Sequence, residues 1–252
     1  NPAEERSARG GITMAFARVY SVQPNFPASD IVSVEADLGR GLYSFAVVGL
    51  PDKAVEEARD RISSAIKHSG FESPKSKNHK VVISLAPADV KKEGPVFDLP
   101  MAMAYLLASE EISFDPKGIL FLGELALDGT LRGVKGTLAA ALSAKERGFS
   151  SIVVPKDNAR EAALVEDIAV YGAKNLSEVI EHLAGKIKIS ATPHSRPSTS
   201  SGQFSIDMAD IAGQETAKRG IEIAAAGRHN VALVGPPGTG KTMLAQALVG
   251  IL

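Results

Sequence analysis

Eight consecutive residues near the end of the chain have the types and the spacing of a phosphate-binding loop. They are Gly235, Pro236, Pro237, Gly238, Thr239, Gly240, Lys241 and Thr242, and they fit the Walker A pattern G-x-x-x-x-G-K-[ST]. Glycines in such a loop let successive backbone N–H groups converge on an anion. Lys241 is expected to reach the β- and γ-phosphates, and the Thr242 hydroxyl to ligate Mg²⁺. The octet therefore predicts that the intact protein binds ATP or GTP.

The segments on either side of the octet favour the elements that such a loop needs. Residues 230–234 form a short apolar run that predicts a buried parallel strand. Residues 242–248 are strong helix formers, and the start of that helix would face the phosphates. A glycine-rich turn that matches the pattern by chance is the alternative, and the flanking segments argue against it.

Only ten residues follow Thr242. Phosphoryl transfer also needs an acidic group on a second strand and usually an arginine finger, and these residues supply neither. We therefore expect the chain to hold only the first part of a motor and not to hydrolyse ATP. We also expect residues 213–252 either to be loosely packed or to pack against the rest of the chain. The sequence leaves open whether the loop in this fragment still binds nucleotide.

The composition excludes several classes of protein. The chain has 252 residues, of which 44% are hydrophobic, and a net charge of −1, so it lacks the global basic field of a dedicated nucleic-acid binder. It has no cysteine, which excludes disulfides and thiolate metal sites and is compatible with a cytoplasmic protein. No apolar run reaches the roughly 18 residues of a membrane span, and the polar residues 1–13 do not form a signal peptide. We expect no membrane partner.

Patterns of strands and helices alternate from Met14 to about Gly185, which predicts an α/β domain. The expected strands cover residues 17–22, 31–37, 43–48, 80–85, 119–127, 130–132, 151–154 and 168–171, with a hairpin turn at Asp128-Gly129. One expected helix begins near Pro51 and ends near Gly70. Others cover residues 99–109, 138–147 and 158–164. A last helix, capped by Ser177, runs to Leu183. In the first helix, Val55, Ala58, Ile62, Ala65 and Ile66 share one face.

Changes in composition divide the chain into four parts. Residues 1–13 are an extension, residues 14–185 the α/β domain, residues 186–206 a Ser/Thr/Pro-rich flexible linker, and residues 207–252 the start of an AAA+ module. In the last part, a helix over residues 215–226 ends at Gly227 and precedes the expected strand and loop. The five histidines are scattered without the spacing of metal ligands.

Several motifs together resemble the ComM/YifB family of magnesium-chelatase-like AAA+ proteins. They are Val48-Gly49-Leu50-Pro51-Asp52-Lys53-Ala54-Val55, Leu85-Ala86-Pro87-Ala88-Asp89, Lys92-Glu93-Gly94 with Phe97-Asp98-Leu99-Pro100, the run from Leu120 to Gly129, Gly213-Gln214 and the run from Arg228 to Thr242. The resemblance covers nearly all of residues 14–252 except the linker. It implies an N-terminal domain similar to the Lon protease domain and the RadA C-terminal domain, with the ribosomal protein S5 domain 2-like α/β sandwich fold.

The resemblance also implies an activity for the parent protein. Family members linked to natural transformation are homo-hexameric, ATP-driven helicases that promote branch migration of recombining DNA, single-stranded or branched. The motor resembles the ATPase subunit of magnesium chelatase. Insertion of Mg²⁺ into a porphyrin needs other subunits, so the resemblance does not extend to that reaction.

Similarity to Lon raises the alternative of a Ser-Lys peptidase, which needs a serine hydroxyl and a lysine amine in contact. The positions that match the Lon serine and lysine hold Val96 and Leu138, and Lys135 lies three residues from the second position. Neither Val96 nor Leu138 can do the chemistry, so we expect no proteolysis.

Two further roles remain open for residues 14–185. Lys75, Lys77 and Lys80 cluster with His79, ahead of Lys91 and Lys92, and could contact DNA phosphates. A solvated loop is the favoured interpretation of this cluster, given the near-zero net charge. The other role is a non-enzymatic assembly or partner-binding module, with the acidic helix over residues 52–60 facing solvent or a neighbouring subunit.

Overall fold

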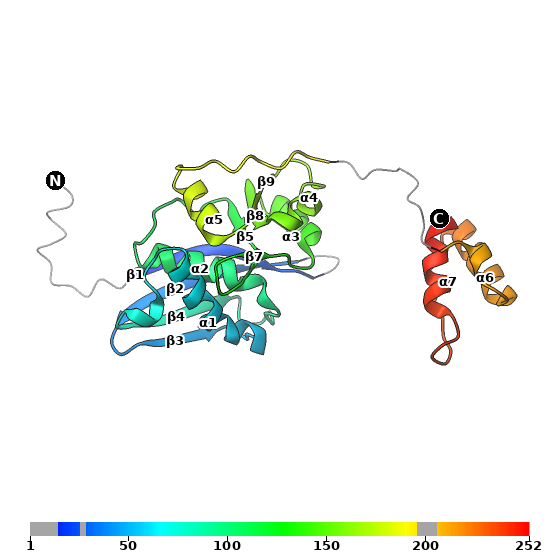
Figure 1. The fold of residues 1–252 in the computed structure, drawn as a ribbon, viewed down its shortest axis with the longest axis horizontal. Helices are drawn as coiled ribbons and strands as arrows, with labels where there is room; N and C mark the ends of the chain where they lie inside the picture. The colour runs from blue at the N-terminus through cyan, green and yellow to red at the C-terminus, as the bar shows by residue number, and fades with distance from the viewer. Residues whose placement is uncertain (1–14, 26–28, 196–205, 252) are drawn as a thin grey trace, which may run out of the picture. The chain divides into compact units, whose positions relative to one another are not determined.

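The computed structural model describes residues 15–25, 29–195 and 206–251 (Figure 1). The chain divides into two compact units, Asn1–Arg196 and Pro197–Leu252. The extension predicted over residues 1–13 lies outside the described residues, as do residues 196–205 of the predicted linker. No helix in the described ranges is both long enough and apolar enough to cross a membrane.

The first unit is built on a mixed seven-stranded sheet with the order β3-β4-β2-β1-β5-β8-β9 (Figure 1). Its strands are β1 (Ala15–Gln23), β2 (Asp30–Arg40), β3 (Ser44–Val48), β4 (His79–Ala86), β5 (Ile119–Phe121), β8 (Ser151–Pro155) and β9 (Ala169–Ala173). Strands β4, β2 and β1 pair antiparallel, whereas β3 runs parallel to β4 and the neighbours from β1 to β9 are parallel. The predicted α/β class is confirmed.

Among the described residues, five α-helices accompany this sheet. They are α1 (Lys53–His68), α2 (Asp98–Ala108), α3 (Thr137–Glu146), α4 (Ala159–Ala162) and α5 (Leu176–Leu183), with 3₁₀ turns at Pro74–Ser76, Pro95–Phe97 and Lys156–Asn158. All five apolar positions predicted for one face of the first helix are buried in α1. Helix α2 is buried almost all round and packs on α1, β1 and β2, as expected for a helix that is apolar on all sides apart from Asp98 at its start. One hydrophobic core therefore joins these elements.

The predicted hairpin is confirmed, but the strand before it is shorter than expected. Strands β6 (Glu124–Leu125) and β7 (Leu131–Arg132) pair antiparallel across Asp128-Gly129, and Asp128 Oδ1 accepts the N–H of Thr130 at 2.9 Å. Residues 119–127 do not form one strand, because the chain turns away at Gly123. There the Gly123 N–H donates to the Val96 carbonyl, and an added Cβ would lie 2.9 Å from Leu131 Cδ2.

The starts of two helices differ from the prediction. Pro51 lies before α1 rather than in its first turn, and the N-cap is Asp52, whose carboxylate accepts the Val55 N–H at 2.8 Å. The cap of α5 is Asn175 and not Ser177, because the Asn175 Oδ1 accepts the Glu178 N–H at 2.8 Å. In both cases a side-chain oxygen one residue before the helix satisfies an amide of the first turn.

The first half of the predicted linker is hydrogen-bonded to the first unit. The Thr192 N–H donates to the Val170 carbonyl of β9 at 2.8 Å, and the Ser195 N–H donates to the Ala163 carbonyl at 3.2 Å. His194 Nδ1 lies 2.8 Å from the same Ala163 oxygen. This segment therefore contacts β9 at Val170 and the end of α4 at Ala163.

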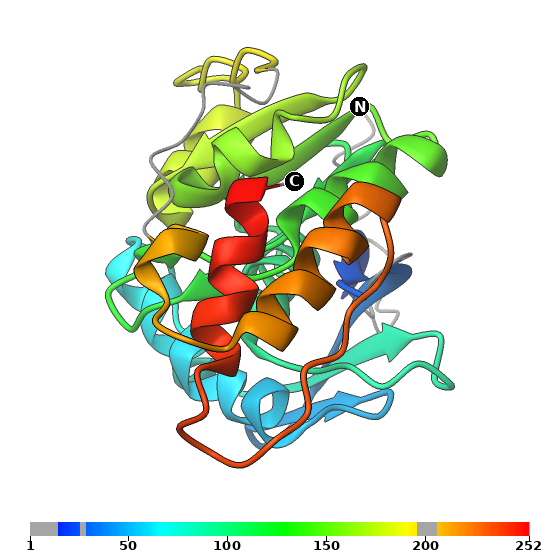
Figure 2. The same cartoon turned by 90° about the vertical axis from the view of Figure 1, so that its right-hand side faces the viewer.

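The second unit contains α6 (Glu215–Gly227), α7 (Lys241–Leu248) and 3₁₀ turns at Met208–Asp210 and Val249–Ile251. Helices α6 and α7 lie side by side (Figure 2) around a core of Ile211, Ile221, Leu244 and Ala247. The strand predicted over residues 230–234 is wrong, since this segment is irregular and Val234 is 96% exposed. A parallel strand needs a neighbour, and the described part of this unit contains none.

Candidate nucleotide-binding site

The predicted phosphate loop is shaped by glycines in the left-handed region. Gly238 and Gly240 both have φ near +80°, a conformation that costs glycine little and other residues more. No atom lies within 4 Å of a Cβ built on either glycine, so the need for glycine here is conformational rather than steric. Gly240 is also the N-cap of α7, so the loop leads directly into a helix as the motif requires.

Lys241, the first residue of α7, turns back onto the loop. Its Nζ donates to the carbonyls of Gly235 at 2.9 Å and Pro236 at 2.6 Å, and lies 3.4 Å from Thr239 Oγ1. Thr239 Oγ1 in turn donates to the Pro236 carbonyl at 3.0 Å. The ammonium therefore lies over the loop, where it can exchange carbonyl oxygens for the oxygens of a phosphate.

The start of α7 offers further anion donors. The first amide of this helix with a backbone acceptor is that of Leu244, which donates to the Gly240 carbonyl at 3.0 Å. Within the described ranges, the amides of Lys241, Thr242 and Met243 have no such acceptor. They add to the partial positive charge of a helix N-terminus, which favours a phosphate. Thr242 is exposed in this first turn, and its hydroxyl is a ligand type that suits Mg²⁺.

Gln214 is a loop contact that the sequence did not assign. Its Nε2 donates to the Thr239 carbonyl at 3.4 Å, and its own backbone has φ +61° at the start of α6. The pair Gly213-Gln214 was part of the family resemblance but had no role in the predicted site. Its only local signal is a glycine ahead of a helix, which does not reveal a contact 25 residues away.

Two of the three lysines that were considered as possible DNA contacts form ion pairs with carboxylates. Lys75 Nζ lies 2.8 Å from Asp60 Oδ1, and this hydrogen bond raises the pKa of Lys75 and lowers the pKa of Asp60. Lys77 Nζ contacts Glu111 at 2.5 Å and Glu72 at 3.3 Å. Lys80 is exposed on β4 and forms no ion pair with any residue that the structure describes. The cluster is therefore less basic than its sequence indicates.

No three metal-ligating side chains of His, Cys, Asp or Glu come together within residues 15–25, 29–195 and 206–251.

Comparisons with known proteins match both units to one family. A family model for subunit ChlI of Mg-chelatase matches residues 34–158, and a second model for magnesium chelatase subunit ChlI matches residues 207–252. The chain is 43% identical to the competence protein ComM of Haemophilus influenzae over 95% of its own length and 47% of that protein. It is 45% identical to the protein YifB of Escherichia coli over 88% of its length and 43% of that protein.

The chain belongs to the ComM/YifB family. It spans about half the length of the curated relatives it matches. The match to the ChlI models agrees with the magnesium-chelatase-like motor predicted from the sequence.

This ComM/YifB chain is also 28% identical to Lon protease 1 of Bacillus subtilis, over 63% of its length and 22% of that protein. Val96, which the sequence predicts to match the Lon serine, is buried next to Gly94 and Pro95 in a cleft of about 540 Å³. Lys135 lines the same cleft, whereas Leu138 lines the neighbouring one. The described residues that line the Val96 cleft include no serine, threonine, tyrosine or cysteine.

Proposed function

We propose that the protein containing this chain is an ATP-driven AAA+ motor that moves branched DNA during recombination. The relative named as a competence protein supports a role in natural transformation. In this proposal the protein acts as a homo-hexamer on single-stranded or branched DNA, and the second unit supplies the beginning of its motor domain.

The single observation that carries this proposal is the junction between the loop and α7. Two left-handed glycines precede the helix, and Lys241 and Thr242 are its first residues. Lys241 would hold the β- and γ-phosphates of ATP, and Thr242 would ligate the Mg²⁺ that accompanies them. The bound metal nucleotide would supply the reactive phosphoryl group. The glycines would let the backbone approach it.

We further propose that the chain by itself does not hydrolyse ATP. Hydrolysis needs an acidic side chain on a second strand that positions water and metal. The described part of the second unit has no strand beside the loop that could carry such a group. Hydrolysis would then require residues that correspond to the part of the ComM relative outside the match.

For the first unit, we propose the ribosomal protein S5 domain 2-like fold without the protease activity of its Lon relatives. The missing nucleophile next to Val96 supports this proposal. Its role would be that of a non-enzymatic module for assembly or partner binding. This role is compatible with the motor function and does not replace it.

The proposal is tested with the full-length protein in a branch-migration assay on a synthetic four-way junction. We expect ATP-dependent migration by the wild type and loss of it in Lys241→Ala. Lys218→Ala is the matched control, since Lys218 lies in the same unit and its one ion pair among the described residues is with Glu215 at 3.6 Å. Migration by Lys241→Ala at the wild-type rate would contradict the proposed motor.

A further inference from the structure

The chain that follows α5 returns across the first unit. Residues 186–195, the strap, pass β9 and the end of α4 (Figure 1). The strap has no helix or strand of its own, and most of its residues are exposed. Its position therefore depends on a few hydrogen bonds to neighbouring elements, which makes it a segment that can open locally while the core stays folded.

His182, in the last turn of α5, provides one of these bonds. Its Nδ1 accepts the Ile189 N–H at 3.1 Å. Because a backbone amide can only donate, this Nδ1 carries no proton, and the neutral ring has its proton on Nε2. Ile189 is partly buried and packs against the hydrophobic core. The bond therefore attaches to α5 a strap residue that contacts the core.

The surroundings of the His182 ring disfavour its charged form. The ring lies against Tyr171 of β9, with 4.4 Å between the two ring centroids. Burial lowers the pKa of His182 below its ordinary value of 6.5, and no charged group contributes to this shift. The titratable groups on the elements that pack around the ring, besides His194, are Tyr171 on β9, Glu178 and Glu181 on α5, and Lys186 and Lys188 in the strap.

Protonation of His182 removes the acceptor of the Ile189 N–H. A proton on Nδ1 would point at that N–H, so that two donors would face each other. A strap that has moved away leaves the ring free to take up the proton in water. Since the pKa is lower with the strap in place, the strap is held most firmly above about pH 6.5, and its attachment weakens as the pH falls through the lowered pKa.

His194, farther along the strap, responds in the opposite direction. Its Nδ1 lies 2.8 Å from the Ala163 carbonyl oxygen, and its Nε2 lies 3.3 Å from Glu166 Oε1. A protonated ring donates to both oxygens, whereas a neutral ring donates to only one of them. Acid therefore favours this second contact, which lies next to the backbone bonds of Thr192 and Ser195.

From these contacts we infer that His182 is a latch for the strap, closed by its unprotonated Nδ1 and opened by protonation of the ring. Opening releases residues 186–191 and withdraws Ile189 from the core. The strap stays attached at Thr192, His194 and Ser195. The latch is thus a pH-sensitive device in the segment just before Arg196, where the first unit ends. This inference is independent of the nucleotide site.

The test is a nuclear magnetic resonance titration of this chain from pH 7.5 to pH 5. We expect the Ile189 amide signal to move toward its unfolded position together with the titration of the His182 ring, while the Ser195 amide stays in place. The ratio of released to attached strap should rise by up to about tenfold per pH unit between the two pKa values of the ring. An Ile189 amide that does not move over this range would overturn the inference, whether or not the ring titrates.

His182→Asn separates the latch from every other titrating group. Its side-chain oxygen can accept the Ile189 N–H in place of Nδ1 and is not protonated in this range. We expect the Ile189 amide of this variant to be the same at pH 7.5 and pH 5. A response equal to that of the wild type would overturn the inference, because it would assign the change to another group, such as Asp98 with its pKa of about 6. His194→Asn is the matched control and should keep the wild-type response of Ile189.

Proteolysis at pH 7.5 tests the latch without a change of pH. His182→Ala removes the acceptor, so a lysine-specific protease should cleave after Lys188 at least about threefold faster than in the wild type. His182→Asn should be cleaved at the wild-type rate. Equal rates for His182→Ala and the wild type would overturn the role of His182 in holding the strap.

Discussion

The guanidinium of Arg61 holds both carboxylate oxygens of Asp98, with Nε 2.7 Å from Oδ2 and Nη2 3.0 Å from Oδ1. The Asp98 side chain is completely buried, and its Oδ2 also accepts the Leu125 N–H at 3.1 Å. Arg61 Nη2 donates to the Ala54 carbonyl as well. The pair therefore joins α1, α2 and the β6-β7 hairpin at one buried point.

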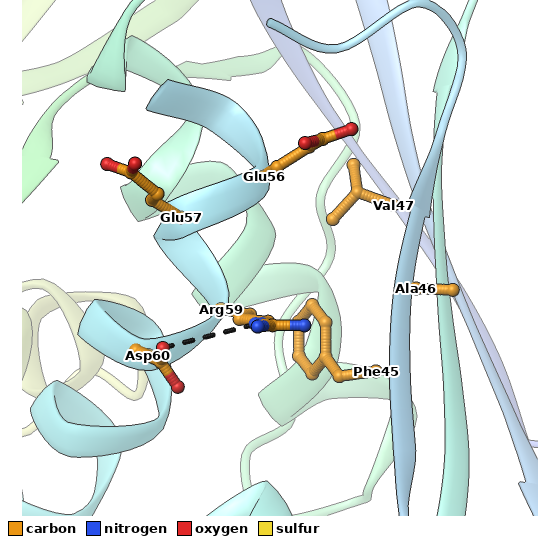
Figure 3. A pocket seen from close by; sticks show the side chains of 7 residues that line it. All are labelled: Phe45, Ala46, Val47, Glu56, Glu57, Arg59 and Asp60. Carbon is orange, nitrogen blue, oxygen red and sulfur yellow. Dashed lines mark ion pairs between the residues drawn. The ribbon is translucent and has the colours of Figure 1, made fainter. Parts of the chain in front are cut away.

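We predict that Arg61→Ala lowers the unfolding free energy by roughly 3–5 kcal/mol at pH 7, because it leaves a buried carboxylate without its counter-charge. Urea unfolding measures this loss. Arg59→Ala is the control and should change stability by less than about 0.5 kcal/mol, since Arg59 is exposed and lies 3.9 Å from Asp60 (Figure 3). A loss for Arg61→Ala no larger than that of the control would contradict a structural role for the pair.

The same pair predicts a pH dependence. Burial raises the pKa of Asp98 from 3.8 to about 6, against the opposing effects of Arg61 and the Leu125 N–H. Because the folded pKa is the higher one, the contribution of Asp98 to the unfolding free energy falls as the pH rises from about 4 to about 6. In Arg61→Ala, a protonated Asp98 is tolerated better than a carboxylate. The loss of stability should therefore be smaller at pH 5 than at pH 7, and an equal loss at both would contradict this assignment.

The cap of α5 gives a test that separates the structure from the sequence-based expectation. Asn175→Ala should cost about 1 kcal/mol, because it removes the acceptor of the Glu178 N–H. Ser177→Ala should cost less than half as much, since Ser177 lies inside the helix. Thermal unfolding of the two variants gives the comparison. The reverse order would mean that Ser177 is the cap after all.

Local patterns were sufficient where neighbouring residues decide the structure. The five buried positions of α1 follow from helical periodicity, and Asp128-Gly129 marks its hairpin through turn chemistry alone. The phosphate octet is likewise a local motif. Its glycines and its lysine were assigned from sequence because their roles depend on the loop itself.

Features that depend on contacts between residues far apart in the sequence could not be predicted from local patterns. The apolar run ending at Val234 has strand propensity, but a strand forms only where another strand can pair with it. Parallel pairing of β1 with β5 joins residues 100 positions apart, Tyr20 and Leu120, and no local signal gives that order. The contact of Gln214 with the Thr239 carbonyl is of the same kind.

The lysines considered as possible DNA contacts differ in whether a carboxylate pairs with them. If the first unit binds DNA, Lys80→Ala should reduce the slope of log affinity against log salt by about one, the effect of losing one phosphate contact. The double variant Lys75→Ala, Asp60→Ala should leave the slope unchanged, because it removes a charge and its partner together. Titration of single-stranded DNA at several salt concentrations measures both. Equal reductions in the two variants would contradict the assignment to Lys80.

Calorimetry of this chain with Mg-ATP measures whether residues 235–242 bind a magnesium nucleotide. We expect saturable binding by the wild type and by Lys218→Ala, and none by Lys241→Ala. Wild-type binding that persists unchanged in Lys241→Ala would place the nucleotide elsewhere. No binding by the wild type would contradict the claim that the loop and the start of α7 form a nucleotide site in this chain.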